Sequence, residues 1–367
     1  MFNNILSRTY VNYLLGKTTM KMFELGQTGL KVSELCLGTM TYGTQTAEAD
    51  AHRQIDLCLS NNINFIDTAE MYPVNPISAD TVGRSEEIIG QWISANKNRR
   101  SDFILATKHS GQGLSHVRNG APITKGTIND AIEGSLKRLK TDYIDLYQFH
   151  WPNRGSYMFR QNWKYDPSGQ DKKSTLENMY ECLIILQNQV DKGNIRHFGL
   201  SNESAWGTAN WLKLSEQHNL PRVATIQNEY SLLCRLYDTD LAELSVNEGV
   251  GLMAFSPLAA GLLTGKYLDG NLPKNCRKSI NQDLGGRDNV RSEMAVRSYL
   301  KIAKEFGLDP IHLALAWCRT RPFMCSSIFG ATTVDQLPVI LQSVDIELTQ
   351  ECIDLINEAH KLNPMPF

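Results

Sequence analysis

The sequence lacks features that mark several protein classes. It has no apolar run of 18 or more residues, so it predicts no membrane-spanning helix. Lys and Arg number 37 against 39 Asp and Glu, which argues against nucleic-acid binding because that function needs a basic face. The eight cysteines form no C-x-x-C pair. We therefore expect neither a disulfide framework nor a zinc site, but buried thiols in a cytoplasmic protein.

The chain has enough material for a full core. Of its 367 residues 42% are hydrophobic, which suits one large α/β domain or two ordinary ones. The first segment contains Arg8 and Lys17 and no acid. It fits a transit peptide, but we favour a disordered extension or a true start at Met20 or Met22. We predict an extension over residues 1–20 and one domain over 21–367.

Short apolar runs alternate with segments of helical spacing. Ile132, Leu136 and Leu139 form one apolar stripe, and a longer one over 176–190 opens with "STLE", a capping-box pattern, and ends near Gly193. Eight runs read as strands: 33–38, 63–67, 103–108, 143–149, 196–200, 223–228, 250–257 and 325–330.

Eight such units predict an α/β fold, a closed (β/α)8 TIM barrel of parallel strands. The alternative is an open doubly wound sheet. That fold normally shows G-x-G-x-x-G after its first strand, and "LCLGTMTYG" lacks it. The longest loops, 109–127, 151–174 and 264–290, should lie at the C-terminal rim, where such barrels place their sites.

Three consecutive strand-like runs end on ionisable residues. "INFIDTAEMY" ends its apolar part on Asp67, "DFILATKH" delivers Lys108, and "YIDLYQFHW" delivers His150. Neighbouring strands lie about 4.8 Å apart, so these side chains can meet. Tyr72, in the loop after Asp67, can fold back over them. One such strand end is usually structural, but three in a row with a phenol indicate a catalytic site.

These four residue types suit proton donation to a carbonyl oxygen. Tyrosine holds its proton at neutral pH, and the ammonium of Lys108 would lower the pKa of Tyr72. Asp67 would keep Lys108 charged and in place. His150 would offer an N–H to the substrate oxygen. The hydride needed for carbonyl reduction must then come from a cofactor.

The remaining strand ends offer groups for such a cofactor. Ser201, Asn202 and Gln227 could hold a carboxamide, and Phe255 offers a flat face for a ring. The small residues leading to Lys266 suit a pyrophosphate. "GLLTGK" is nevertheless not a P-loop, because its spacing is one residue short.

The order "GTM", "IDTAEMY", "ATKH", "YQFHW", "GLSN", "IQNEYSLL", "FSPLAAGLLTGKY" and "GATTVDQL" resembles the aldo-keto reductase superfamily over residues 21 to 363. It is especially similar to the Tas-like bacterial members and more distantly to potassium-channel β-subunits. The resemblance implies a (β/α)8 barrel that reduces aldehydes or ketones with NADPH. The implied catalytic residues are Asp67, Tyr72, Lys108 and His150.

The resemblance also implies a cofactor site. Its residues are Gly38, Thr39, Met40, Ser201, Asn202, Gln227, Phe255, Ser256, Leu258, Gly261, Lys266, Arg277, Gly330, Thr332 and Gln336. Arg277 resembles the arginine that relatives aim at the 2′-phosphate. Relatives often carry Glu-Asn where this chain has Val339 and Ile340. The expected preference for NADPH over NADH therefore rests on Arg277 and Lys266.

The substrate is expected to be a small aldehyde or activated ketone. Tyr42, Met71 and Trp151 are candidates for its pocket, and Trp163 is either a pocket residue or a loop anchor. The competing function is an NADPH-binding regulatory or sensor subunit resembling the channel β-subunits. A metal-dependent hydrolase would need clustered ligands at the strand ends, so we expect no metal. The pattern does not predict the oligomeric state.

Overall fold

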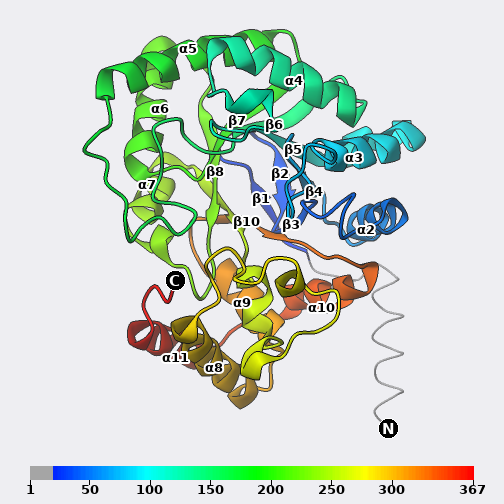
Figure 1. Cartoon of the computed structure of the whole chain (residues 1–367), viewed down its shortest axis with the longest axis vertical. Helices are drawn as coiled ribbons and strands as arrows, with labels where there is room; N and C mark the ends of the chain where they lie inside the picture. The colour runs from blue at the N-terminus through cyan, green and yellow to red at the C-terminus, as the bar shows by residue number, and fades with distance from the viewer. Residues whose placement is uncertain (1–19) are drawn as a thin grey trace.

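Eight parallel strands form a closed barrel in the computed structural model, which describes residues 20–367 (Figure 1). Around the barrel the order is β10-β3-β4-β5-β6-β7-β8-β9. The strands are β3 (Leu35–Gly38), β4 (Phe65–Asp67), β5 (Ile104–His109), β6 (Ile144–Phe149), β7 (Ile195–Ser201), β8 (Val223–Glu229), β9 (Gly251–Phe255) and β10 (Met324–Phe329). Each comes from one of the eight predicted runs, so the TIM-barrel prediction is confirmed.

Helices surround the barrel on its outer face (Figure 1). They are α2 (Glu48–Ser60), α3 (Arg84–Ala95), α4 (Lys125–Leu139), α5 (Lys172–Asp191), α6 (Ala205–His218), α7 (Asp240–Glu248), α8 (Val290–Glu305), α9 (Pro310–Arg319), α10 (Leu337–Gln342) and α11 (Gln350–Leu362). Their apolar faces and the outward side chains of the strands build the main core. Between residues 20 and 367, no helix has the length and apolar character needed to cross a membrane.

A short antiparallel hairpin precedes the barrel, formed by β1 (Met22–Glu24) and β2 (Lys31–Ser33). The sequence did not predict it, because three-residue strands give too little periodicity. Leu25 and Val32 are fully buried against the barrel interior, so the hairpin closes the N-terminal end. Gly26 permits this, since a Cβ there would lie 2.3 Å from the Ala224 carbonyl oxygen.

The start of α5 differs from the prediction. The "STLE" pattern suggested a helix that begins at Ser174, but α5 begins at Lys172. Asp171 is the N-cap, and its side chain accepts a hydrogen bond from the Ser174 N–H at 3.0 Å. Because Asp171 already caps the helix, the chain is helical from Lys172 onward and Ser174 lies within the first turn. The helix ends at Asp191, close to Gly193 as predicted.

The barrel interior changes character along its axis. The lower layer is apolar and includes Phe65, Ala106 and Leu146. Two residues further along the same strands, the side chains on the same face are Asp67, Lys108 and Gln148. The charged groups thus lie on an apolar floor at the C-terminal mouth. The expected extension over 1–20 lies, apart from Met20, outside the described residues.

Candidate active site

A buried ion pair lies at the mouth of the barrel. Lys108 Nζ donates to Asp67 Oδ2 at 2.6 Å and to the Thr68 carbonyl oxygen at 2.7 Å. Burial alone would lower the pKa of Lys108, but the nearby Asp67 carboxylate and Tyr72 outweigh burial and raise that pKa above its ordinary value. Lys108 is therefore held as a cation, which is the role expected for Asp67.

Tyr72 and His150 lie over this pair. The Lys108 Nζ is 4.9 Å from the centre of the Tyr72 ring, and the Tyr72 and His150 rings are 5.8 Å apart in an edge-to-face arrangement. The structure thus brings all four predicted catalytic side chains together. Burial raises the pKa of Tyr72, and the charge of Lys108 only partly offsets it. We expected a lowered pKa for Tyr72, and that expectation was wrong for the net direction.

His150 is held in its neutral form. Burial, followed by the charge of Lys108, lowers its pKa well below the ordinary value. Its Nδ1 is buried and makes no hydrogen bond with residues 20–367. A neutral imidazole has one N–H and one lone pair, so His150 can donate a hydrogen bond without adding a second positive charge beside Lys108.

Two glutamines complete the surroundings of Asp67. Gln227 Nε2 donates to Asp67 Oδ1 at 2.8 Å, and Gln148 Nε2 donates to the same oxygen at 3.2 Å. Gln227 Nε2 also donates to Gln148 Oε1 at 3.2 Å. All three residues are at most 2% exposed. Asp67 therefore accepts hydrogen bonds on both oxygens, as a buried carboxylate requires.

The remaining carboxamide candidates lie at the end of β7. Ser201 Oγ donates to the Gln227 carbonyl oxygen at 2.8 Å, and Asn202 Nδ2 donates to the His150 carbonyl oxygen at 2.9 Å. Asn202 Oδ1 is buried and finds no hydrogen-bond donor within residues 20–367. Asn202 also has a φ of 53°, in the left-handed region that asparagine tolerates.

The segment after β3 is less available than the sequence suggested. Thr39 is fully buried, and its Oγ1 donates to the Asp67 carbonyl oxygen at 3.0 Å. Gly38 lies so close to β10 that a Cβ would be 2.8 Å from Ile328. Met40 is half-buried, and its carbonyl oxygen accepts from the Val74 N–H at 3.0 Å. Gly38 and Thr39 thus pack against neighbouring strands and hold the strand ends around Asp67 in place.

The candidates for the nicotinamide ring and the pyrophosphate follow β9, and those for the adenosine end follow β10. Phe255 ends β9 and is half-buried, with Ser256 and Leu258 in the turn that follows it. Gly261 has a φ of 94°, and a Cβ there would be 3.2 Å from Lys266 Nζ. After β10, Gln336 Oε1 accepts from the Thr332 N–H at 2.8 Å, and Gly330 is exposed. The residues predicted to contact the pyrophosphate and the adenosine end therefore lie along one side of the mouth.

Arg277 lies near enough to Tyr72 for its charge to act on that residue. Burial and then the nearby Arg287 lower its pKa to about 10, and its own charge acts to lower the pKa of Tyr72. Its Nε is buried with no acceptor among residues 20–367. Beside it, Glu229 accepts from Arg160 Nη1 at 2.7 Å and from Arg287 Nε at 2.6 Å. This cluster joins the loops after β6 and β9 across the mouth.

The predicted substrate residues divide into two groups. Met71 and Trp151 belong to a small apolar cluster that includes Tyr72 and Val117, so they flank the candidate catalytic tyrosine. Tyr42 does not, and its prediction as a pocket residue was wrong. It is fully buried in the main core, and its hydroxyl donates to Gln54 at 3.2 Å. The backbone after β3 turns its side chain outward, beneath α2 and α3.

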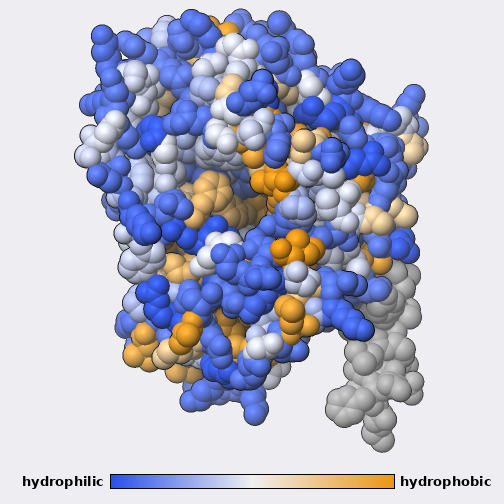
Figure 2. Space-filling model, viewed as in Figure 1, coloured by the Kyte–Doolittle hydropathy of each residue, from blue (hydrophilic) through white to orange (hydrophobic). Residues whose placement is uncertain are grey.

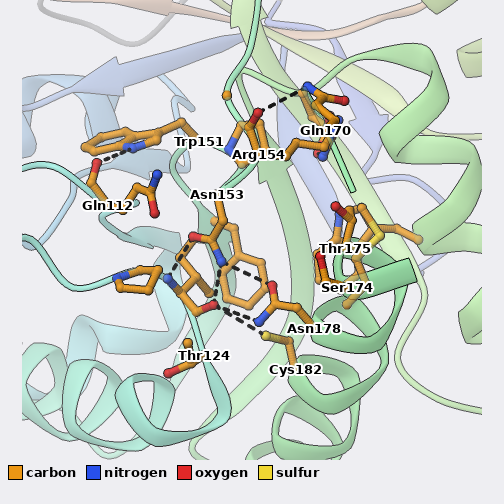
Figure 3. Close-up of a pocket in the computed structure, with 18 of the residues that line it drawn as sticks. Gln112, Thr124, Trp151, Asn153, Arg154, Gln170, Ser174, Thr175, Asn178 and Cys182 are labelled. Carbon is orange, nitrogen blue, oxygen red and sulfur yellow. Dashed lines mark hydrogen bonds and ion pairs between the residues drawn. The ribbon is translucent and has the colours of Figure 1, made fainter. Parts of the chain in front are cut away.

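A separate cavity of about 620 Å³ lies beside the mouth (Figure 3). It is lined by the loop after β6, the segment just before α4, one face of α5 and the end of β7 with Ser201, and none of the four catalytic candidates lines it. Trp151 forms one wall, where its Nε1 donates to the Gln112 carbonyl oxygen at 3.1 Å. The Trp151 ring also lies 5.0 Å from the His150 ring. Trp151 therefore contacts both the candidate catalytic residue His150 and this cavity.

The molecular surface is hollowed on the face seen in Figure 2. Figure 2 shows a depression near the centre of one face, with apolar residues inside it and a mostly hydrophilic surface around it.

Trp163, the remaining aromatic candidate, is 55% exposed, and the Arg291 guanidinium lies 5.2 Å from its ring centre. This contact between the loop after β6 and α8 fits a loop anchor.

Sequence reasoning missed several residues of the site. Gln148 was not predicted because it lies inside an apolar strand. A glutamine on the same face as His150, two positions earlier in a buried strand, does indicate a buried hydrogen-bond partner. Glu70 was noticed only as a neighbour of Asp67. It accepts from the Ser110 N–H and from both Nη atoms of Arg118, which fixes the loop after β5. Arg118 lies 48 positions away, so no local pattern connects the two.

Comparisons with known proteins agree with this geometry. Residues 34–361 match the model of the aldo/keto reductase family.

The chain belongs to the aldo/keto reductase family.

Individual relatives of this aldo/keto reductase cover nearly its whole length. It is 40% identical to Protein tas of Escherichia coli (strain K12) over 350 residues, which is 95% of this chain and 99% of that protein. It is 33% identical to the uncharacterized oxidoreductase YrpG of Bacillus subtilis, over 92% of this chain and 95% of that one. A probable voltage-gated potassium channel subunit beta of Arabidopsis thaliana is also 33% identical, over 94% and 98%.

Proposed function

We propose that this aldo/keto reductase transfers a hydride from NADPH to an aldehyde or ketone, with Tyr72 as the proton donor. The observation that supports this most directly is the group at the barrel mouth. A buried Lys108–Asp67 pair, with its N–O distance of 2.6 Å, lies beneath a tyrosine and a neutral histidine. A proton donor, a fixed cation and a neutral hydrogen-bond donor are what carbonyl reduction requires of a protein.

The residues at the mouth suit a nicotinamide cofactor. Asn202 Oδ1 is a buried acceptor without a donor from residues 20–367, beside Ser201, and an amide N–H₂ would satisfy it. Lys266 and Arg277 offer cations for phosphate groups, and the pKa of each is lowered by burial, which an anionic partner would relieve. When bound, the cofactor would supply the hydride.

The chain's own residues would handle the proton. The pKa of Tyr72 is raised, so its hydroxyl is protonated at neutral pH and can donate to the carbonyl oxygen. The phenolate left behind would lie close to Lys108, whose charge Asp67 maintains. His150, neutral because of burial, would donate a hydrogen bond to the same substrate oxygen. Met71 and Trp151 would form the apolar wall that positions the rest of the substrate.

A second candidate function is a regulatory or sensor subunit that binds NADPH and turns over slowly. Its support is the relative described as a probable potassium channel subunit beta, which is 33% identical to this chain. The two functions share the cofactor and differ in turnover. The B. subtilis relative is described as an oxidoreductase, which favours the reductase, and a measurement of turnover distinguishes the two functions.

One cuvette experiment tests both candidates. Purified protein is titrated into NADPH while the nicotinamide fluorescence is recorded, and 4-nitrobenzaldehyde is then added. Binding followed by oxidation of NADPH is the expected result and supports the reductase. Binding without oxidation across a broad panel of carbonyl compounds would favour the regulatory subunit. An unchanged NADPH signal at micromolar protein would remove the basis of both proposals.

A further inference from the structure

The orientation of the Gln227 side-chain amide follows from its neighbours. Asp67 as a carboxylate can only accept hydrogen bonds, so both glutamines that contact its Oδ1 must present their N–H₂ groups to it. The remaining contact of this triangle joins Gln227 Nε2 to Gln148 Oε1 at 3.2 Å. Both hydrogens of the Gln227 amide are thereby used, one on Asp67 and one on Gln148.

This arrangement turns Gln227 Oε1 away from Asp67. Within residues 20–367, that oxygen accepts no hydrogen bond. Without Gln148, one hydrogen bond to Asp67 would be the only contact that fixes the Gln227 amide. With Gln148 the amide is held at two points, and its oxygen is kept as a free acceptor on the side where a cofactor amide would bind.

The side chain of Gln148 is itself held by the barrel. It is fully buried on β6, and the neighbouring position on β7 is Gly199. A Cβ at Gly199 would lie 3.3 Å from Gln148 Cγ and 2.9 Å from Thr225 Oγ1, so a larger residue would crowd the glutamine. An alternative rotamer would bury an amide without hydrogen-bond partners, which is unfavourable. Gln148 is therefore a fixed reference for Gln227.

We propose that Gln148 is a positioning residue for the nicotinamide carboxamide. It acts through Gln227, whose Oε1 it keeps aimed to accept from the carboxamide N–H₂. This inference rests on the proposed function, because it requires a nicotinamide cofactor at the mouth. It adds a residue that touches neither substrate nor cofactor, and it makes the amide group of the cofactor the part that is recognised.

The test compares two cofactors that differ only in that group. In 3-acetylpyridine adenine dinucleotide phosphate, a methyl replaces the amide N–H₂ of NADP⁺, so the analogue keeps the oxygen but cannot donate. Dissociation constants for both are measured by quenching of tryptophan fluorescence in the wild type, Gln148→Leu and Gln148→Met. The unbranched methionine variant covers the case in which leucine does not fold. Gln189→Leu removes an equally buried glutamine on α5, away from the mouth, and is the control.

Loss of one oriented hydrogen bond corresponds to about a fivefold change in affinity. We expect each Gln148 variant to bind NADP⁺ about fivefold more weakly and the analogue less than about twofold more weakly. The control should change neither. Equal losses for both cofactors would mean that Gln148 is merely structural, and unchanged affinities would mean that Gln227 is oriented without it; either overturns the proposal. If the wild type binds neither cofactor, the proposed function fails first.

Discussion

The two halves of the barrel interior are built from the same strands and have opposite chemistry. The N-terminal half is apolar, with Phe65, Ala106 and Leu146 packed against the β1–β2 hairpin that closes this end. The C-terminal half, one inward position further along, contains Asp67 and Lys108. The first half contributes to stability by removing apolar surface from water. The second half places an ion pair on that apolar floor, where each charge depends strongly on its partner.

The difference explains the pKa values at the mouth. The apolar floor and surrounding residues remove water, which raises the pKa of Tyr72 and lowers that of His150. Lys108, paired with Asp67, keeps its charge against burial. The floor thus keeps Tyr72, the proposed proton donor, protonated and His150 neutral, while the ion pair supplies a fixed positive charge beneath the tyrosine. Four substitutions and the pH profile of the wild type would break or sharpen this contrast.

Replacing Tyr72 with Phe should have the largest effect, because it removes only the hydroxyl. We expect carbonyl reduction to fall about 10²- to 10⁴-fold, the usual contribution of general acid catalysis. NADPH affinity, measured by fluorescence quenching, should stay within about twofold. Tyr157→Phe, in the loop after β6, serves as the control. Comparable losses of turnover and cofactor binding would place Tyr72 in the wrong role.

Replacing Lys108 with Met should destabilise the mouth, because it leaves the Asp67 charge buried without its cation. The expected loss is about 3–5 kcal/mol in the free energy of unfolding, measured with urea. Asp67→Asn added to this variant should recover part of the loss. Lys125→Met breaks an exposed pair with Glu181 and should cost less than about 1 kcal/mol. A double variant no more stable than the single one would contradict the coupling.

Replacing Leu146 with Ala tests the apolar half by itself. The cavity should cost about 2–5 kcal/mol of unfolding free energy. The shape of the pH profile for reduction should not move, since Leu146 bears no charge. Leu362, which is 82% exposed, gives a control whose change to Ala should cost less than about 0.5 kcal/mol. A displaced pH profile in Leu146→Ala would show that the two halves are not separable.

Replacing Arg277 with Ala tests the proposed cofactor preference at the rim. If its guanidinium binds the 2′-phosphate, NADPH affinity should fall about tenfold or more, with little change for NADH. Titrations of both cofactors measure the ratio, and the exposed Arg291→Ala is the control. Similar losses for NADPH and NADH would instead place Arg277 on a part common to both.

The smallest effect is expected in the pH profile of the wild type, where the rate of reduction should change little with pH near neutrality. If Tyr72 is the proton donor, reduction needs its protonated form, and because its pKa is raised above the ordinary value we expect activity to fall only in the alkaline range. The pKa of His150 is lowered, so no limb is expected near pH 6.5 as the pH falls from 8 to about 6. Steady-state kcat/KM, measured from about pH 6 into the alkaline range, tests the alkaline fall and the absence of a limb near pH 6.5. A limb near pH 6.5 that disappears in His150→Asn would contradict the neutral histidine.

The sequence predicted much of this fold because its signals are local. Each barrel strand is a short apolar run, and alternation along it fixes which residues face inward. The same rule placed Asp67, Lys108 and His150 at one rim. It failed for Tyr42, because the turn after a strand has no fixed period, and for the hairpin β1–β2, whose strands are three residues each.

What the sequence determined by itself is the set of strand ends, since parallel strands of one barrel must bring them to the same mouth. The tertiary structure decided how those ends act on one another. It set the direction of the Tyr72 pKa shift, because burial is a property of the packed mouth. It also joined Gln148 and Gln227, 79 positions apart, on one oxygen of Asp67. Hydrogen bonds over such separations depend on the closure of the barrel, which no local pattern in the chain encodes.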